Sequence, residues 1–365
     1  MATKMKDYFN ADTAKRLGAQ LGIDGEEYAA WVAPRVEGLE ILDRVTVFAQ
    51  GLRERLAGDY VGMVGGVVDK LGPELAEGEG YFNHAFHLWP VSRFIELYGL
   101  DEPNVSLDGI EALTRAFTGE WAVRPFLEHY PELTMSRVHE WADSDSHNVR
   151  RLASEGIRPR LPWAKVHKPF VADPSPILPV LDRLYDDETL FVRKSVANNL
   201  NDISRTHPEL ALATAARWAN SGATHAAWVV EQGLRGLIKS GHSEALELVG
   251  FSPYTAVTAS RPEFPNTVAI GEKATLSATL TNTGNVAANV LAEYRVHFLK
   301  KNGIRQPSVF RLGKYTLAPG ETRVVTKTHP FRVISTRTYY PGTQAVSLVI
   351  NGREGELVDF EFTQQ

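Results

Sequence analysis

The chain contains no cysteine, which excludes disulfide bonds and zinc sites built from thiolates. It has no apolar run of about 18 residues, the length that a membrane-spanning helix needs. The N-terminal stretch Met1–Asp7 is polar and lacks the apolar segment of a secretory signal. Neither a glycine-rich phosphate loop nor a Gly-x-Ser-x-Gly elbow is present. We therefore predict a globular, cytoplasmic protein that is neither a nucleotide-cofactor enzyme nor a serine hydrolase.

The distribution of charge says more than its total. The 365 residues carry a net charge of -5 and are 43% apolar, which is enough for one large or two ordinary domains. Residues 1–100 and 101–251 each carry a net charge of -5, whereas residues 252–365 carry +5. The basic last third, and any local basic strip in the acidic part, can therefore still meet a polyanion.

The texture of the sequence changes near residue 250. Before it, apolar residues recur at helical spacing, with turn residues every 12 to 20 positions. After Phe251 come Thr- and Val-rich runs, such as Lys273–Leu280 and Ala345–Ile350, separated by turn pairs such as Asn351-Gly352. We predict a multidomain α and β protein: an α-helical HEAT-like repeat domain over residues 1–250, followed by an immunoglobulin-like β-sandwich over residues 251–365.

The helical half contains an internal repeat. Pro131-Glu-Leu and Pro208-Glu-Leu are each followed, ten residues after the proline, by a Trp-Ala pair, which gives a period of 77 residues. Residues 143–151 match residues 186–194 at a shift of 43, so the period divides into two units of about 40 residues, the size of a HEAT-like helix pair. Stacking of such units predicts a curved solenoid. We expect Arg150 and Arg193 to line one of its surfaces.

A basic strip interrupts the acidic middle of the chain. Residues 147–168 hold six basic side chains and one acidic one, Glu155. Pro159 and Pro162 prevent a regular helix, so the end of this strip forms an ordered loop. Phosphate contact is the economical explanation of the cations, and solvated charge is the alternative. Trp163 on the loop is either a core residue or a wall that faces a nucleobase or sugar. The six cations are Arg150, Arg151, Arg158, Arg160, Lys165 and Lys168.

Three carboxylates are candidates for chemistry. Asp202 lies near the C-terminus of a helix predicted over residues 189–204, where the macrodipole disfavours an anion; the alternative is a solvated carboxylate, paired with Arg205. Glu155 lies four residues after Arg151, so an ordinary helical ion pair is its alternative role. Glu120 opens a predicted helix, where an acid is favoured for capping alone.

A histidine pair and a basic cluster are two further patterns in the sequence. His84-x-x-His87 has the spacing of a metal pair, but no acidic third ligand lies nearby, so packing histidines are expected, with no metal and no cofactor. Lys300, Lys301 and Arg305 form a basic cluster on a predicted turn of the β half. This cluster could straddle a DNA groove, or it could be a solvated hairpin tip.

Two segments, His147–Trp163 and Phe117–Phe126, resemble the DNA alkylation repair glycosylases built from HEAT-like repeats, specifically the AlkC branch. The likeness covers about residues 5–250, and branch members with a C-terminal immunoglobulin-like module are known. Gly119 and Trp121 stand where Ser and Phe would be expected. The resemblance implies a monofunctional glycosylase of base excision repair, which hydrolyses the N-glycosidic bond of 3-methyladenine and 3-methylcytosine without extruding the base.

The resemblance also implies roles for residues. Asp202, Glu155 and Glu120 would be catalytic, and Trp163 would lie near the lesion. The partner would be double-stranded DNA containing alkylated bases, bound by a monomer. A non-enzymatic scaffold is the alternative function, in which the same carboxylates would be merely solvated. The residues expected to contact DNA are Arg150, Arg151, Arg158, Arg160, Lys168, Arg193, Lys300, Lys301 and Arg305.

Overall fold

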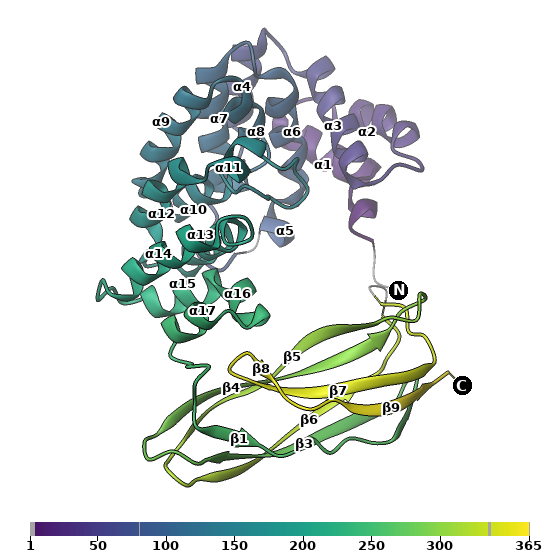
Figure 1. Cartoon of the computed structure of the whole chain (residues 1–365). Helices are drawn as coiled ribbons and strands as arrows, with labels where there is room; N and C mark the ends of the chain where they lie inside the picture. Colours follow the sequence, from purple (N-terminus) through teal and green to yellow (C-terminus); the bar gives the residue numbers. More distant parts are fainter. Residues whose placement is uncertain (1–3, 80, 335–336, 365) are drawn as a thin grey trace. The chain divides into compact units, whose positions relative to one another are not determined.

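The computed structural model describes residues 4–79, 81–334 and 337–364, and it consists of helices up to Leu248 and strands from Val257 onward (Figure 1). This confirms the predicted fold class. The chain divides into two compact units, Met1–His207 with Ser221–Gly233 and Pro208–Asn220 with Leu234–Gln365. The domain division at residue 250 stays a prediction. No helix in the described part is long and apolar enough to cross a bilayer.

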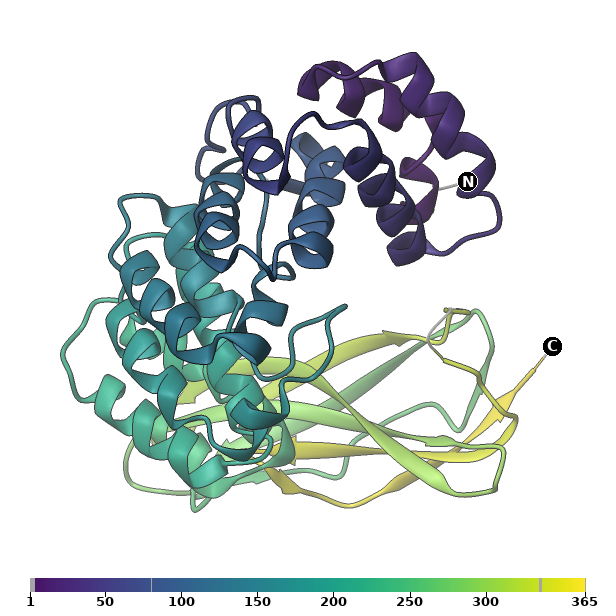
Figure 2. The same ribbon diagram turned by 90° about the horizontal axis from the view of Figure 1, so that it is seen from above.

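Short segments connect successive helices along the chain. Figure 2 shows the helices of the first unit lying side by side. Short 3-10 helices occur at Met5–Tyr8, Ala33–Arg35, Phe86–Leu88 and Ser175–Ile177. The α-helices are α1 (Ala11–Leu21), α2 (Gly25–Val32), α3 (Ile41–Arg55), α4 (Tyr60–Val68), α5 (Tyr81–His84), α6 (Trp89–Tyr98), α7 (Pro103–Ala116), α8 (Val123–His129), α9 (Pro131–Ala142), α10 (His147–Glu155), α11 (Lys168–Ala172), α12 (Leu178–Leu184), α13 (Leu190–Ile203), α14 (Pro208–Ala219), α15 (Ala226–Gly233), α16 (Arg235–Ser240) and α17 (Ser243–Leu248).

The repeat seen in the sequence is a repeat of helices. Helices α9 and α14 are both 12 residues long and both begin at the proline of the repeated motif. Helix α10 packs on α9 and on α13, and α13 packs in turn on α12 and α15. Each helix of the row α10, α13 and α15 therefore contacts the next one. This is the arrangement of HEAT-like units.

Helix α13 is buried on both sides because it packs between α10 and α15. Val192, Val196 and Leu200 form its apolar stripe, as the spacing predicts. The opposite, polar face is packed as well, since Ser195 and Asp202 are both buried. A polar face that is packed inside a repeat must find its partners in the neighbouring helix.

The strands form a sandwich of two sheets in the second unit. One sheet has the order β1-β3-β6, and the other has the order β2-β9-β7-β4-β5, with β8 paired to β7. Asn351 and Gly352 both have positive φ, 45° and 80°, at the predicted turn after β7. The strands are β1 (Val257–Ala259), β2 (Thr267–Ala269), β3 (Lys273–Asn282), β4 (Ala288–Leu299), β5 (Arg305–Leu317), β6 (Thr322–Pro330), β7 (Gly342–Ile350), β8 (Arg353–Glu354) and β9 (Val358–Thr363).

Candidate active site

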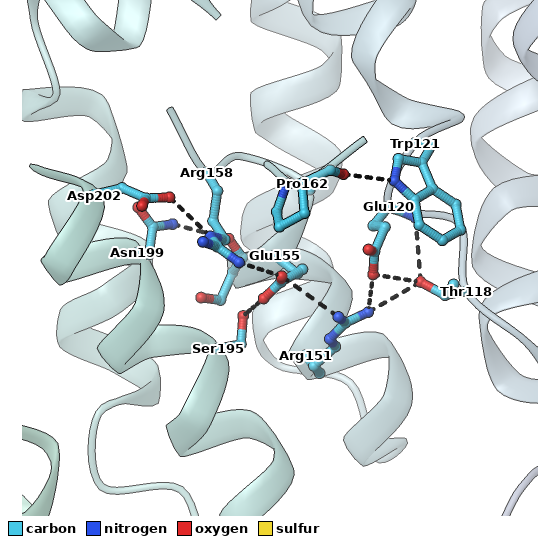
Figure 3. A network of polar contacts seen from close by, with 12 residues as sticks. Thr118, Glu120, Trp121, Arg151, Glu155, Arg158, Pro162, Ser195, Asn199 and Asp202 are labelled. Atoms are coloured by element: carbon cyan, nitrogen blue, oxygen red, sulfur yellow. Dashed lines mark hydrogen bonds and ion pairs between the residues drawn. The ribbon is translucent and has the colours of Figure 1, made fainter. Parts of the chain in front are cut away.

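A network of charged side chains lies between the turn before α8 and helices α10 and α13 (Figure 3). Helix α10 begins where the Ser146 hydroxyl accepts a hydrogen bond from the amide of Val149, at 3.3 Å, and it ends at Glu155. The proline-containing loop then leads Arg158 back toward Glu155. The network consists of three carboxylates and two guanidinium groups, from Glu120, Glu155, Asp202, Arg151 and Arg158.

Glu155 is the centre of the network, and both of its carboxylate oxygens are occupied. Oε1 accepts a hydrogen bond from Arg158 Nη1 at 2.7 Å and lies 3.5 Å from Arg151 Nη2. Oε2 accepts the hydroxyl of Ser195 at 2.7 Å. The ion pair with Arg151 that the sequence allowed is therefore present. It is one contact among several, so it does not account for Glu155 by itself.

Glu120 and Asp202 lie at the two ends of the network. Oε2 of Glu120 accepts hydrogen bonds from Arg151 and, at 2.9 Å, from the Thr118 hydroxyl. Oδ2 of Asp202 accepts Arg158 Nε at 2.9 Å. The exposed fractions of Glu120 and Asp202 are only 4% and 2%.

Two alternatives from the sequence are therefore wrong. Asp202 is not a solvated carboxylate, because α10 and its exit loop cover it. Glu120 is not a helix cap: it lies in a turn, and α8 begins three residues later, at Val123, with no side-chain cap.

The two outer carboxylates each keep one oxygen open. Among the described residues, none donates a hydrogen bond to Oε1 of Glu120 or to Oδ1 of Asp202. The network can therefore direct Oε1 of Glu120 and Oδ1 of Asp202 at a ligand. Both oxygens of Glu155 already accept hydrogen bonds.

The charges in the network do not balance. When its five groups are ionised, three carboxylates face two guanidinium groups, which leaves one negative charge in excess inside the network. Arg205 acts on Asp202 from outside the network and lowers the pKa of that carboxyl. Burial raises the pKa of Glu120, against the effect of Arg151, and burial also raises the pKa of Asp202, against that of Arg158. Burial opposes ionisation of Glu155 too, but its two arginine neighbours outweigh it and lower that pKa. A cation at the outer carboxylates would restore the balance.

Trp163, on the loop that follows α10, has an unusual backbone. Its φ is 60°, in the left-handed region that bulky residues rarely adopt. The indole stacks on Trp89, with ring centroids 5.3 Å apart, and lies 6.2 Å from that of Trp121. Trp163 is nevertheless 46% exposed, whereas its two partners are buried. This exposure speaks against a core residue, and the role of a wall that faces a nucleobase or sugar stays a prediction.

Arg124 holds the loop that carries Trp163, and the sequence analysis gave it no role. Its Nη1 donates to the carbonyl oxygens of Gly156 and Arg158, at 3.0 and 2.8 Å, and its Nη2 donates to that of Lys165 at 3.1 Å. Burial lowers its pKa to about 10. The only signal for it in the sequence is its place in the Trp-Ala-Val-Arg-Pro segment.

Arg150 and Arg193 make matching contacts at equivalent positions of two repeats. Arg150 Nη1 donates to the carbonyl oxygens five and six residues before it, both at 3.0 Å, and Arg193 Nη1 does the same at 2.9 and 2.6 Å. Arg150 also forms two hydrogen bonds with the Asp187 carboxylate, at 2.6 and 3.2 Å. These contacts tie the helices to the preceding turns. DNA contact by these two arginines stays a prediction.

The other residues predicted to contact DNA differ in whether their side chains already bind another residue of the protein. Arg160 donates no hydrogen bond to any residue that the structure describes, and Lys168 is exposed at the start of α11. Lys300 and the exposed Lys301 lie at the hairpin tip between β4 and β5, as expected, but Arg305 pairs with Asp359 at 2.5 Å. Arg151 and Arg158 belong to the carboxylate network.

Of the two histidines, His87 is a packing residue, as expected, whereas His84 is not. His84 is exposed, whereas His87 is buried and its Nε2 lies 2.7 Å from Oε1 of Gln20. Burial lowers the pKa of His87 to about 4, so the ring is neutral near pH 7. Within the described ranges, no group of three or more histidine or acidic side chains could hold a metal ion.

Family models match parts of both the helical and the strand-forming halves of the chain. The family described as "DNA alkylation repair enzyme" matches residues 118–231, which include the whole network, and "Uncharacterised protein YhaZ, C-terminal Ig-like domain" matches residues 258–364. The uncharacterised protein YhaZ of Bacillus subtilis (strain 168) is 37% identical over 269 residues, which cover 73% of this chain and 74% of YhaZ.

A solved structure is similar over nearly the full length. It is the Pseudomonas fluorescens alkylpurine DNA glycosylase AlkC, bound to DNA that contains an abasic site analogue. The TM-score is 0.92 at 29% sequence identity, with 99% of this chain and 100% of that chain covered. The chain therefore belongs to the DNA alkylation repair enzyme family, in the AlkC-like branch that joins helical repeats to an immunoglobulin-like domain.

Proposed function

We propose that this protein is a monofunctional DNA glycosylase of base excision repair that removes cationic N3-methylated bases, 3-methyladenine and 3-methylcytosine. One observation carries the proposal: a buried network with one carboxylate more than it has guanidinium groups, whose two outer carboxylates each keep an oxygen open. Such a site attracts a positive charge. The similarity to an alkylpurine DNA glycosylase supports the same activity.

The chemistry requires what this site offers. An N3-methylated base is already cationic, so the N-glycosidic bond can break with its electron pair passing to the base, which leaves neutral. The deoxyribose C1′ is left with oxocarbenium character, which a nearby carboxylate stabilises electrostatically. The oxygen of a water molecule then bonds to C1′, and its proton passes to a carboxylate. No general acid is needed to protonate the leaving base.

The network suggests a division of these tasks. Asp202 and Glu120 have the open oxygens, so they would face the sugar and the attacking water. Glu155 has both oxygens occupied and would position Arg151 and Arg158. Because the carboxylates would act at the sugar rather than at the base, the base need not be extruded into a pocket.

Double-stranded DNA with an alkylated base is the proposed partner of a monomer. Arg160, Lys168, Lys300 and Lys301 would contact its phosphates, because they are not held by carboxylates in the described structure. The related AlkC structure contains DNA, which supports this partner. The scaffold alternative required solvated carboxylates, and burial of all three speaks against it.

The direct test is to incubate the full-length protein with duplex DNA treated with a methylating agent and to separate the released bases by chromatography. We expect free 3-methyladenine and 3-methylcytosine to appear in proportion to enzyme and time. Untreated DNA should release nothing. If an unrelated 3-methyladenine glycosylase releases bases from the same DNA and this protein does not, the proposal is wrong.

A further inference from the structure

Arg124, near the start of α8, is a buried cation that backbone carbonyl groups hold in place. Its guanidinium donates to the carbonyl oxygens of Gly156, Arg158 and Lys165, at 3.0, 2.8 and 3.1 Å. Burial lowers the pKa of Arg124 to about 10, so the group keeps its charge near pH 7. No carboxylate in the described part of the chain forms an ion pair with it. The hydrogen bonds of Arg124 thus go to the segment that follows α10.

The backbone of Arg158 is fixed from two sides. Its amide donates to the carbonyl oxygen of Glu155 at 3.2 Å, and its own carbonyl oxygen accepts Arg124. The start of α8 lies close to this segment because of Gly156: a Cβ atom at that position would come within 2.8 Å of Cγ1 of Val123. The side chain of Arg158 therefore begins at a fixed point of the backbone.

An arginine suits this task better than a lysine. Its planar guanidinium offers five donors in a rigid fork, whereas an ammonium group is a compact charge on a flexible stem. The charge is favoured there as well, because the macrodipole places partial negative charge at the C-terminal end of α10. Glu155 adds a full negative charge at that end. Both the shape and the charge of Arg124 therefore match the end of α10 and the loop that leaves it.

We propose that Arg124 is a positioning residue, which acts through the side chain of Arg158 on the two carboxylates that Arg158 binds. Arg158 donates from Nε to Asp202 at 2.9 Å and from Nη1 to Glu155 at 2.7 Å (Figure 3), so a displacement of its backbone changes both contacts. A displacement of about 1 Å can reduce a rate by about 100-fold. The effect on catalysis rests on the proposed glycosylase function, whereas the effect on the side chain of Arg158 does not.

Arg44 on α3 provides a matched control for substitutions of Arg124. It too donates to three backbone carbonyl oxygens, at 3.0, 3.2 and 3.3 Å, and it lies in the same unit without a hydrogen bond to the network. Arg124→Gln and Arg44→Gln each remove a charge and a fork of donors. Arg124→Lys keeps the charge but loses the fork, and it decides the outcome alone if Arg124→Gln does not fold.

The first measurement follows Arg158 itself and needs no substrate. In proton–nitrogen correlation spectra of the full-length protein, the hydrogen bond to Asp202 slows exchange of the Arg158 Nε proton with water. We expect this exchange to be faster by a factor of about ten or more in Arg124→Gln, intermediate in Arg124→Lys and unchanged in Arg44→Gln. Exchange that stays at the wild-type rate in the Arg124 variants would overturn the proposal.

The second measurement is a double-mutant cycle on single-turnover release of 3-methyladenine. Arg124→Gln should slow release by a factor of about ten or more, while affinity for a duplex with an abasic-site analogue stays within about threefold of the wild type. Because both residues act through the same contacts, adding Arg124→Gln to Arg158→Gln should cause no further loss. Additive losses would also overturn the proposal. If proton exchange responds as expected but the wild type releases no base, the glycosylase proposal alone fails.

Discussion

Arg158 holds Asp202 by one hydrogen bond, from Nε to Oδ2 at 2.9 Å, and leaves the second oxygen of that carboxylate open. The same guanidinium donates from Nη1 to Glu155, whose other oxygen accepts Ser195. Arg158 thus orients the Asp202 carboxylate and leaves its Oδ1 without a hydrogen bond. This difference between an open and a fully occupied carboxylate underlies the first two predictions.

Asp202→Asn should abolish catalysis and preserve binding. The amide keeps the size of the side chain but loses the charge that would stabilise the oxocarbenium ion, so we expect base release to fall by a factor of about 100 or more. Single-turnover release of 3-methyladenine measures the loss. Affinity for a duplex with an abasic-site analogue should stay within about twofold of the wild type, which is the control. Undiminished turnover would remove Asp202 from the site.

Asp202→Asn and Glu155→Gln should differ in their effect on the free energy of unfolding. The pKa of Asp202 is raised, so folding is favoured by its neutral form below its unfolded pKa, and this contribution is lost as the pH rises through the folded pKa. At pH 7 the ionised form is a cost, and Asp202→Asn should not destabilise the protein. The pKa of Glu155 is lowered, so its charge stabilises the fold at pH 7. Removing it breaks the buried ion pairs of Glu155 with Arg151 and Arg158, at a cost of about 3 kcal/mol.

Denaturant unfolding of the wild type and both variants at pH 7 checks this expectation, since the midpoints report changes in the free energy of unfolding. Ser195→Ala is a matched control because it removes one neutral donor from Glu155 and should cost about 1 kcal/mol. Equal losses for Asp202→Asn and Glu155→Gln would contradict the assigned pKa directions.

Arg160 and Arg150 should respond differently to truncation. Arg160 has no hydrogen-bond partner among the described residues, so Arg160→Ala should weaken DNA binding and reduce the slope of log affinity against log salt by about one contact. Arg150 is bonded to Asp187 and to two carbonyl oxygens, so Arg150→Ala should lower stability and leave that slope unchanged. Binding titrations between 50 and 200 mM salt, about the range where the effect is large, measure both. An unchanged slope for Arg160→Ala would mean that Arg160 is a solvated charge that does not contact a phosphate.

The rate of base release should begin to fall, as the pH is lowered, at a higher pH than the ordinary pKa values of carboxyl groups would give. Burial raises the pKa values of Glu120 and Asp202 above their ordinary values of 4.5 and 3.8, and only their ionised forms stabilise a developing cation. The single-turnover rate is therefore expected to decline as the pH falls through these raised pKa values. A buffer-matched profile of DNA binding controls for unfolding. A rate that stays constant down to about pH 4 would refute the expectation.

The sequence predicted elements better than contacts. The helix expected over residues 189–204 is α13, Leu190–Ile203, and the strand expected from Lys273 is β3. Periodicity shows which residues share a face, but it cannot show that α10 covers the polar face of α13. Burial of Asp202 was missed for this reason. Charge patterns likewise do not distinguish an arginine that meets solvent from one that binds backbone carbonyls, as Arg124 and Arg150 do.

The equivalent bonds of Arg150 and Arg193 also bear on how such a chain can change during evolution. Each arginine ties its helix to the turn immediately before it, and five or six residues of sequence contain both partners. A helix pair duplicated or deleted as a block would keep its own tie intact. The bonds from Arg150 to Asp187 of the next unit would not survive such a change, so a change of unit number would cost this second contact.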